Sequence, residues 1–135
     1  MTEPSKLPTV GQIMTQDLVT FTPEREIVDA MTILIDRHLS GAPVLDETGK
    51  LVGVLSKKDC LRAAVNASYY QQWGGKVSDF MTINIQTLDA DLDVMAATQA
   101  FLTSPYRRFP VTSNGELVGQ ISRIDLLRSL SDLWK

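Results

Sequence analysis

A length of 135 residues suits one compact domain or two very small lobes, and it excludes a large multidomain enzyme. Hydrophobic residues make up 44% and charged residues 21%, no apolar stretch approaches the roughly 20 residues of a membrane-spanning helix, and the N-terminus lacks a signal-peptide core. These features predict a soluble, cytoplasmic protein with no membrane partner. Because the net charge of −3 is spread over both halves, neither half is a basic arm, and we expect no nucleic-acid partner.

The first predicted elements are a short strand and a helix. Residues 18–21 form a β-prone run, and Thr22 with Pro23 supplies an N-cap and a proline at the first helical position. A helix is expected to begin there, with apolar residues recurring at three- and four-residue spacing along one face. Ser40 and Gly41 are expected to end it.

A hairpin and a second helix complete the first half of the chain. The apolar runs 42–45 and 51–55 flank a turn that contains a glycine, which predicts two antiparallel strands. Ser56 then caps a helix. The apolar residues of this helix are Leu61, Ala64 and Val65.

Two single residues limit catalytic and metal chemistry. His38 is the one histidine and Cys60 the one cysteine, so the chain lacks a Cys/His cluster for zinc, a Cys–His nucleophile pair and an intramolecular disulfide. His38 is expected at a helix end, where it meets the C-terminal dipole. Cys60 follows two lysines early in a helix and is either a small semi-buried side chain or a somewhat activated thiol. We expect no catalytic residue, no metal and no required cofactor.

The second half of the chain repeats this order of elements. Asp89 is expected to cap a helix with an acidic first turn, Pro105 to stop it, and residues 113–115, Ser-Asn-Gly, to form a hairpin turn. Two glycines after Trp73 indicate a linker at 69–76. The aromatic residues that follow the two closing helices either cover the ends of the lobes or form a dimer surface, and these are Tyr69, Tyr70, Trp73 and Trp134.

Comparison of the chain with itself shows two repeats, at residues 8–68 and 77–135. Val10–Thr15 aligns with Val77–Thr82, and both segments end in Met-Thr. Further along, both copies read Gly-x-Leu-Val-Gly, then Ser-x-x-Asp, then Leu-Arg. A repeat of about 55 to 60 residues is marginal for a core of its own. The two repeats are therefore expected to fold alike and to share one buried interface.

The duplicated Ser-x-x-Asp motif pairs Ser56 with Asp59 and Ser122 with Asp125 at predicted helix starts. Unpaired backbone N–H groups and the helix dipole favour an anion there, such as a phosphate. An ionised Asp can also accept two hydrogen bonds from the vicinal hydroxyls of a ribose. Alternatively, each pair is a capping box that only stabilises its helix, by about 1 kcal/mol. The duplication favours a ligand role for at least one copy.

These motifs, in this order and duplicated, resemble a tandem cystathionine-β-synthase (CBS) domain pair, also called a Bateman module, over nearly the whole chain. The resemblance implies an α+β fold in which two βαββα repeats pack as a pseudo-two-fold pair. It also implies regulation, because such pairs bind AMP, ADP, ATP or S-adenosylmethionine and pass occupancy to a partner. They commonly form homodimers, which we expect here too.

The resemblance implies composite sites, in which the Ser and Asp of one repeat work with the opening segment of the other. One ligand-binding set then comprises Ser122, Asp125, Thr15, Leu18 and Val19. The other comprises Ser56, Asp59, Thr82 and Ile85. For the apolar members of both sets, a place in a core strand is an equally good interpretation.

The phosphate end differs between the repeats. Family members commonly carry basic residues just before the middle proline, and here Arg107 and Arg108 do so in the second repeat, whereas small residues stand in the first. A guanidinium can donate two parallel hydrogen bonds to a phosphate. Lys58 and Arg123 add charge near the helix starts, as phosphate ligands or as solvated surface charges.

We therefore expect a stand-alone sensor of an AMP-, ADP- or ATP-type ligand that regulates an unknown partner protein in trans. One alternative is a dimerisation or scaffold module of the same fold that binds no nucleotide. Another is a sensor of S-adenosylmethionine. An enzyme would need an acid–base pair in a pocket, which the sequence does not indicate.

Overall fold

A computed structural model describes residues 7–70 and 74–135. The chain divides into two compact units, one formed by the residues up to Leu18 together with Gln86–Lys135 and the other by Val19–Ile85. The division does not follow the repeats. The opening segment of each repeat belongs to the unit that holds the body of the other repeat.

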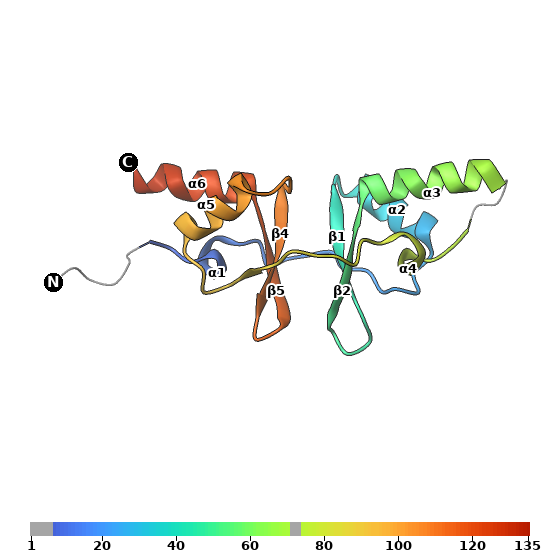
Figure 1. Cartoon of the computed structure of the whole chain (residues 1–135), viewed down its shortest axis with the longest axis horizontal. Helices are drawn as coiled ribbons and strands as arrows, with labels where there is room; N and C mark the ends of the chain where they lie inside the picture. The colour runs from blue at the N-terminus through green and yellow to red at the C-terminus, as the bar shows by residue number, and fades with distance from the viewer. Residues whose placement is uncertain (1–6, 71–73) are drawn as a thin grey trace. The chain divides into compact units, whose positions relative to one another are not determined.

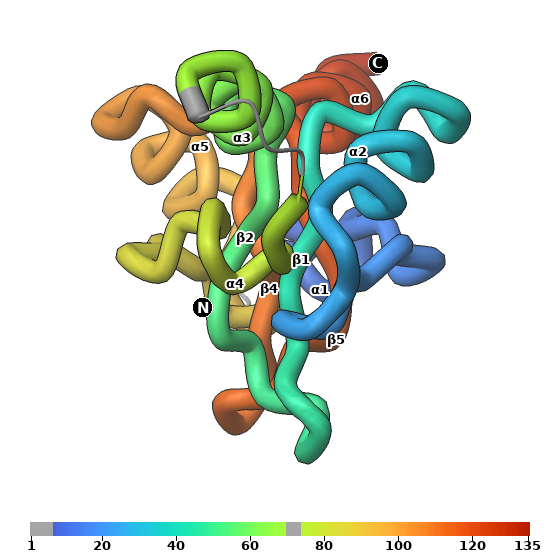
Figure 2. The backbone as a smooth tube through the Cα atoms, turned by 90° about the vertical axis from the view of Figure 1, so that its right-hand side faces the viewer, coloured from blue at the N-terminus to red at the C-terminus, as the bar shows by residue number. Residues whose placement is uncertain are grey.

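The unit Val19–Ile85 is built on an antiparallel hairpin. Its elements are α2 (Ile27–Asp36), β1 (Gly41–Leu45), β2 (Leu51–Ser56), α3 (Lys57–Tyr70) and α4 (Val77–Phe80). Within this unit, α3 leaves one end of the hairpin and the turn between β1 and β2 lies at the opposite end (Figures 1 and 2). The N-terminus of α3 is thus placed at the end of a strand.

The other unit contains a hairpin of the same kind with a third, short strand in parallel. Its elements are α1 (Val10–Ile13), β3 (Leu88–Asp89), α5 (Val94–Leu102), β4 (Arg108–Ser113), β5 (Glu116–Ser122) and α6 (Arg123–Leu133). Asn114 and Gly115 both have positive φ, 53° and 83°, as the predicted tight hairpin turn requires. The expected mixed α+β class with two equivalent repeats is confirmed.

Each opening segment is bound to a hairpin by a pair of backbone hydrogen bonds. Thr82 and Val54 exchange both N–H···O bonds at 2.9 Å, and Thr15 and Gln120 exchange theirs at 2.8 and 2.9 Å. In each unit this adds one more strand-like contact to the second strand of the hairpin. The threonine of each Met-Thr motif is thereby fixed two residues before the end of that strand.

Two apolar cores follow the same division. One packs α2, α3 and the first hairpin around Phe21, Ile27 and Leu55, and it includes Val77 from the second repeat. The other surrounds Phe109 and includes Val10 from the first repeat. Val10 and Val77 are fully buried, which contributes about 1.5 to 3 kcal/mol each. The exchange of opening segments is therefore held by apolar burial as well as by the backbone.

The predicted start and end of α2 were wrong. The helix begins at Ile27, not at Thr22 and Pro23, because the N–H of Ile27 donates to Gly75 O and the Arg25 carbonyl accepts from Val77 N, which pairs this segment with the chain before α4. It ends at Asp36, well before Ser40 and Gly41. The end is a Schellman motif in which His38 takes the left-handed position, with φ 55°.

Two further predictions, the cap of α5 and the strand at 18–21, were wrong. Asp93, not Asp89, caps α5 by accepting a hydrogen bond from Ala96 N at 2.9 Å, because Asp89 is held in β3 opposite Thr112. The apolar residues Leu61 and Val65 of α3 are each 67% exposed and do not form its buried face. The buried residues are instead Asp59, Cys60, Ala63 and Ala67. The strand expected at 18–21 is reduced to one bridge, between Phe21 and Val44.

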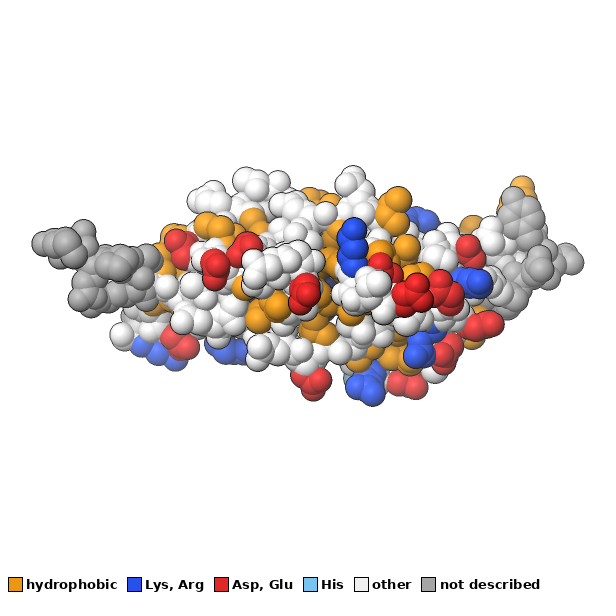
Figure 3. All heavy atoms as spheres, turned by 90° about the horizontal axis from the view of Figure 1, so that it is seen from below, with side chains coloured by type: hydrophobic (Ala, Val, Ile, Leu, Met, Phe, Trp, Pro, Cys, Tyr) orange, Lys and Arg blue, Asp and Glu red, His pale blue; other side chains and the backbone are white. Residues whose placement is uncertain are grey.

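Surface charge is mixed in sign. On the face drawn in Figure 3, Lys and Arg side chains lie among Asp and Glu side chains and form no continuous stripe. Within residues 7–70 and 74–135, no helix has the length and apolar character to cross a membrane.

A methionine–glycine contact explains two of the duplicated motifs. Met14 packs over Gly119, and Met81 over Gly53, so that the opening segment approaches the hairpin backbone closely. A Cβ at Gly119 would lie 2.9 Å from both Met14 Cγ and the backbone oxygen of Thr15. Since the second of these atoms is backbone, a side chain at this position must displace the Thr15 segment.

Gly119→Ala is accordingly expected to lower the free energy of unfolding by about 1 to 3 kcal/mol through overpacking. Chemical denaturation measures the change. The double variant with Met14→Ala should lose less than the sum of the two single variants, because the residues share one contact. Strict additivity would show that the opening segment does not rest on this glycine.

Candidate functional site

The first candidate site lies at the N-terminus of α3 and is centred on Asp59, which is 1% exposed. Its Oδ2 accepts hydrogen bonds from the Ser56 N–H at 2.9 Å and from the Ser56 hydroxyl at 3.0 Å, while the Asp59 N–H donates to Ser56 Oγ at 3.1 Å. This is the reciprocal capping box. It fixes the carboxylate across the start of the helix.

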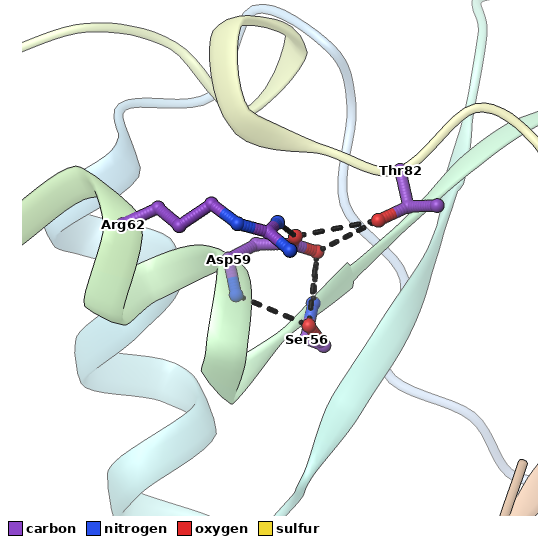
Figure 4. Close-up of polar contacts among 4 residues, drawn as sticks. All are labelled: Ser56, Asp59, Arg62 and Thr82. Carbon is purple, nitrogen blue, oxygen red and sulfur yellow. Dashed lines mark hydrogen bonds and ion pairs between the residues drawn. The ribbon is translucent and has the colours of Figure 1, made fainter. Parts of the chain in front are cut away.

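Two more side chains complete the partners of Asp59 (Figure 4). Arg62, one turn further along α3, donates from Nη1 to Oδ1 at 2.5 Å. The Thr82 hydroxyl, from the opening segment of the second repeat, lies 3.3 Å from Oδ1 and 3.4 Å from Oδ2. Both oxygens of the buried carboxylate therefore have donors from within the chain.

The second candidate site lies at the N-terminus of α6 and is more open. Asp125 Oδ2 accepts from the Ser122 N–H at 2.9 Å, and Ser122 Oγ accepts from the Asp125 N–H at 3.3 Å. Asp125 Oδ1 lies 3.9 Å from Arg128 Nη1, and the Asp125 side chain is 14% exposed. Among the described residues no hydroxyl donates to this carboxylate. Asp125 thus retains acceptor capacity that Asp59 has used.

Arg108 is the half-buried cation of the second site. It stands directly opposite Ser122 in the β4–β5 pair, which brings it to the start of α6. Burial lowers the pKa of the Arg108 guanidinium, and the charge of Asp125 opposes that shift. Arginine nonetheless stays protonated in proteins. Arg107 and Arg123 are exposed, and the Arg123 N–H donates to the Arg107 carbonyl at 3.1 Å.

The remaining predicted site residues take less central positions. Thr15 is exposed and is held beside β5 through its backbone. Lys58 is exposed on the first turn of α3. Three apolar candidates are half-buried: Leu18, Val19 and Ile85. Val19 packs against the core of its unit, which favours the core interpretation for this residue.

Sequence reasoning assigned no role to Arg62 and Arg128, which pair with the two aspartates. The signal was present, because in both repeats the arginine of Leu-Arg stands three residues after the Asp. An i, i+3 spacing on a helix brings the two side chains together. What the sequence did not indicate is the difference between them, 2.5 Å to Asp59 and 3.9 Å to Asp125.

Cys60 is a buried thiol, and the activated alternative is wrong. The side chain is 6% exposed, and burial, with a smaller effect of the Asp59 charge, raises the pKa of the thiol above its ordinary value. The folded chain therefore holds this proton more tightly than the unfolded chain. Its contribution to stability is complete below the ordinary thiol pKa and is lost as the pH rises through the raised value.

Native Cys60 should therefore react slowly with a thiol reagent at pH 8 and rapidly once urea unfolds the chain. Colour development with an aromatic disulfide reagent measures both rates. Fast labelling of the native protein at pH 7 would contradict the burial of this side chain.

His38, the one histidine, is exposed beyond the end of α2.

Comparison with known proteins identifies the family. Models of the CBS domain match residues 10–66 and 77–132. The chain belongs to the CBS domain family. The CBS domain-containing protein CBSX1 of Arabidopsis thaliana, a chloroplast protein, is 30% identical over 90% of this chain and 63% of its own length. The chain spans 44% to 74% of the lengths of the first curated relatives that it matches.

Solved CBS pairs have the same fold. The structure of CBSX2 in complex with AMP superimposes with a TM-score of 0.83 at 28% identity, covering 95% of this chain and 99% of that one. CBSX2 is also a protein of Arabidopsis thaliana. The inosine-5'-monophosphate dehydrogenase of Thermoplasma acidophilum is 30% identical over 85% of this chain but only 22% of its own length. The similarity to that enzyme is thus confined to a small part of it.

Proposed function

We propose that this CBS pair is a regulatory module that binds an adenine nucleotide of the AMP, ADP or ATP type and passes occupancy to a partner protein. The observation that carries the proposal is the α6 site. There, a carboxylate with unused acceptor capacity and a half-buried guanidinium meet at a helix N-terminus. The likeness to CBSX2, whose structure contains AMP, supports the ligand class.

The chemistry of the α6 site suits both ends of a nucleotide. Asp125 accepts the two hydroxyl hydrogen bonds of a ribose, since an ionised carboxylate is an acceptor only. The helix N-terminus and Arg108 favour the negative charge of a phosphate, and a guanidinium binds it with two donors. Arg107 and Arg123 add further positive charge at the same end of β4 and α6. Ribose and phosphate recognition thus come from neighbouring elements of one unit.

The test is a thermal melt of chain from which copurified ligand has been removed, with AMP, ADP, ATP, adenosine and S-adenosylmethionine in turn. An adenine nucleotide at 100 times its dissociation constant stabilises the folded state by about 2.7 kcal/mol. Calorimetry then gives the affinity. If no adenosyl compound shifts the melting temperature at millimolar concentration, the proposal fails and the scaffold alternative takes its place.

The two alternatives differ in what they require of the α6 site. A sensor of S-adenosylmethionine places a sulfonium cation close to the ribose, and Arg108 disfavours it. A scaffold that binds no nucleotide needs only the capping boxes and an interface between copies. The exposed apolar side chains on the helices favour such an interface, and they are compatible with nucleotide binding as well.

The homodimer is proposed on the exposed apolar faces of the closing helices. Leu61 and Val65 on α3 are each 67% exposed and one turn apart, and Leu127 on α6 is 60% exposed. Such faces commonly mark association surfaces, and symmetric dimers are the commonest oligomers. Trp134 is 81% exposed, so it is also available for contact with a second copy of the chain. Trp73 lies outside the described residues, and for Tyr70 only its place at the end of α3 is given.

Light scattering is expected to give about twice the chain mass of 14.9 kDa at tens of micromolar. Leu61→Glu with Val65→Glu should give monomers, since two charges then enter the buried centre of the interface. Ile83→Glu is the control, because Ile83 is equally exposed at 73% but lies outside the helices. A single chain mass for the wild-type protein, with and without AMP, would contradict the homodimer.

We propose no catalytic role for the chain. Further expectations stay predictions. These are the cytoplasmic location, the action in trans, and the repeat limits 8–68 and 77–135 with a linker at 69–76. Within the described part of the chain, no group of three His, Cys, Asp or Glu side chains is placed to hold a metal ion.

A further inference from the structure

The two Ser-x-x-Asp boxes can be compared position by position, because the same backbone bonds surround both. Lys57 N–H donates to the Ser40 carbonyl at 2.8 Å, as Arg123 N–H does to the Arg107 carbonyl at 3.1 Å. Ser56 stands opposite Gly41 across one hairpin, and Ser122 stands opposite Arg108 across the other. Differences between the two boxes are therefore differences of side chains.

The first difference is the state of the carboxylate. Asp59 is 1% exposed and has hydrogen-bonded contacts to Ser56, Arg62 and Thr82. To accept two ribose hydroxyls it would have to lose the bonds to Arg62 and Thr82. Among the described residues, Asp125 has only the bonds with Ser122 and an ion pair with Arg128 at 3.9 Å. A diol can therefore reach Asp125 without breaking a close hydrogen bond.

The second difference is the cation. Arg108 occupies the position of Gly41 in the first repeat, and a Cβ at Gly41 would lie 2.9 Å from the Leu55 carbonyl oxygen and 3.2 Å from Ser56 Cα. A side chain at this position would have to displace the backbone of Leu55 and Ser56, and Gly41 has none, so the α3 box has no counterpart of Arg108. Among the described residues, a half-buried cation stands at the α6 box and none at the α3 box.

We propose that each chain binds a single adenine nucleotide, at Asp125, and that the equivalent Asp59 box is a structural lock that fastens Thr82 and the second opening segment to α3. The proposal rests on the proposed function for the identity of the ligand. The lock itself does not, because its contacts are all within the unit Val19–Ile85. The two halves of the proposal are therefore tested by different measurements.

Calorimetric titration with AMP tests the number of sites. The wild-type chain and Asp59→Asn are expected to bind one AMP per chain, and Asp125→Asn is expected to lose at least tenfold in affinity. Two AMP molecules per wild-type chain, or a loss of binding on Asp59→Asn as large as that on Asp125→Asn, would overturn the single-site assignment. A wild-type chain that binds no adenosyl compound would contradict the proposed function.

Melting temperatures without ligand test the lock, whatever the titration shows. Asp59→Asn should lower the melting temperature by about 10 °C, because it breaks a buried charged network, whereas Asp125→Asn should lower it by about 3 °C, the loss of a capping interaction. If Asp59→Asn does not fold, a milder matched pair decides. Thr82→Val should lower the melting temperature by about 3 °C, because the Thr82 hydroxyl donates to Asp59. Thr15→Val should lower it by less than about 1 °C, because Thr15 is exposed and is held through its backbone. Equal losses within either pair would show that Asp59 is no lock.

Discussion

Asp125→Ala is expected to abolish most of the stabilisation that AMP gives to the wild-type chain. AMP at 100 times the wild-type dissociation constant stabilises the wild-type chain by about 2.7 kcal/mol, and the variant should lose more than half of this, over and above any change in the ligand-free chain. The reason is that the proposed function makes Asp125 the acceptor of the ribose hydroxyls. Adenosine, AMP and ATP should all be affected, since each presents the same diol.

The ligand-free variant gives the baseline, because Asp125 also belongs to the capping box of α6. Loss of that box should cost about 1 kcal/mol. Asp132→Ala is the matched control, since Asp132 is an exposed carboxylate on the same helix that pairs with the exposed Lys135. Full retention of AMP stabilisation by Asp125→Ala would show that AMP does not bind at the α6 site.

Arg107→Ala with Arg108→Ala is expected to discriminate between ligands. The double variant should bind AMP, ADP and ATP more weakly by about 1.5 to 3 kcal/mol for each charge-assisted hydrogen bond lost, and it should bind adenosine almost unchanged. The reason is that the proposed function assigns the phosphate, and not the ribose or purine, to the guanidinium groups. If S-adenosylmethionine binds as well, its affinity should rise, because the cationic sulfonium no longer faces Arg108.

The titrations need a fixed salt concentration, because phosphate contacts at an exposed site are screened as ionic strength rises. Arg37→Ala serves as the control, since Arg37 is exposed and lies in the other unit. Equal losses for adenosine and AMP in the double variant would show that these arginines support the fold and do not bind phosphate.

The sequence predicted the parts of this fold that depend on neighbouring residues. Both hairpins, the Ser-Asn-Gly turn and the two capping boxes lie where local patterns placed them. The start of α2 was predicted wrongly because Thr22 and Pro23 have good local helix chemistry, whereas the backbone groups of Arg25 and Ile27 pair with residues near α4. Such long-range pairing leaves no trace in a local pattern.

The site was predictable to a similar extent. The repeat alignment brought Thr82 to the Asp59 box, where its hydroxyl lies. It did not indicate that both oxygens of Asp59 have close donors and that Asp125 keeps acceptor capacity. That difference depends on burial and on the distance from the arginine Nη1 to the aspartate Oδ1, which is 2.5 Å in one box and 3.9 Å in the other. The buried face of α3 was missed for a related reason. Asp59 is itself buried, so the inward face includes a charged residue that a hydrophobic pattern assigns to solvent.

A crystal structure of the chain soaked with AMP is the sharpest test of nucleotide binding at Asp125, because it locates the ligand, counts the sites and identifies the contacts at once. We expect one AMP per chain, with both ribose hydroxyls donating to Asp125 and the phosphate facing Arg108. AMP bound at Asp59 with Arg62 and Thr82 displaced, or no AMP at the α6 site at a concentration that saturates the chain in solution, would contradict it.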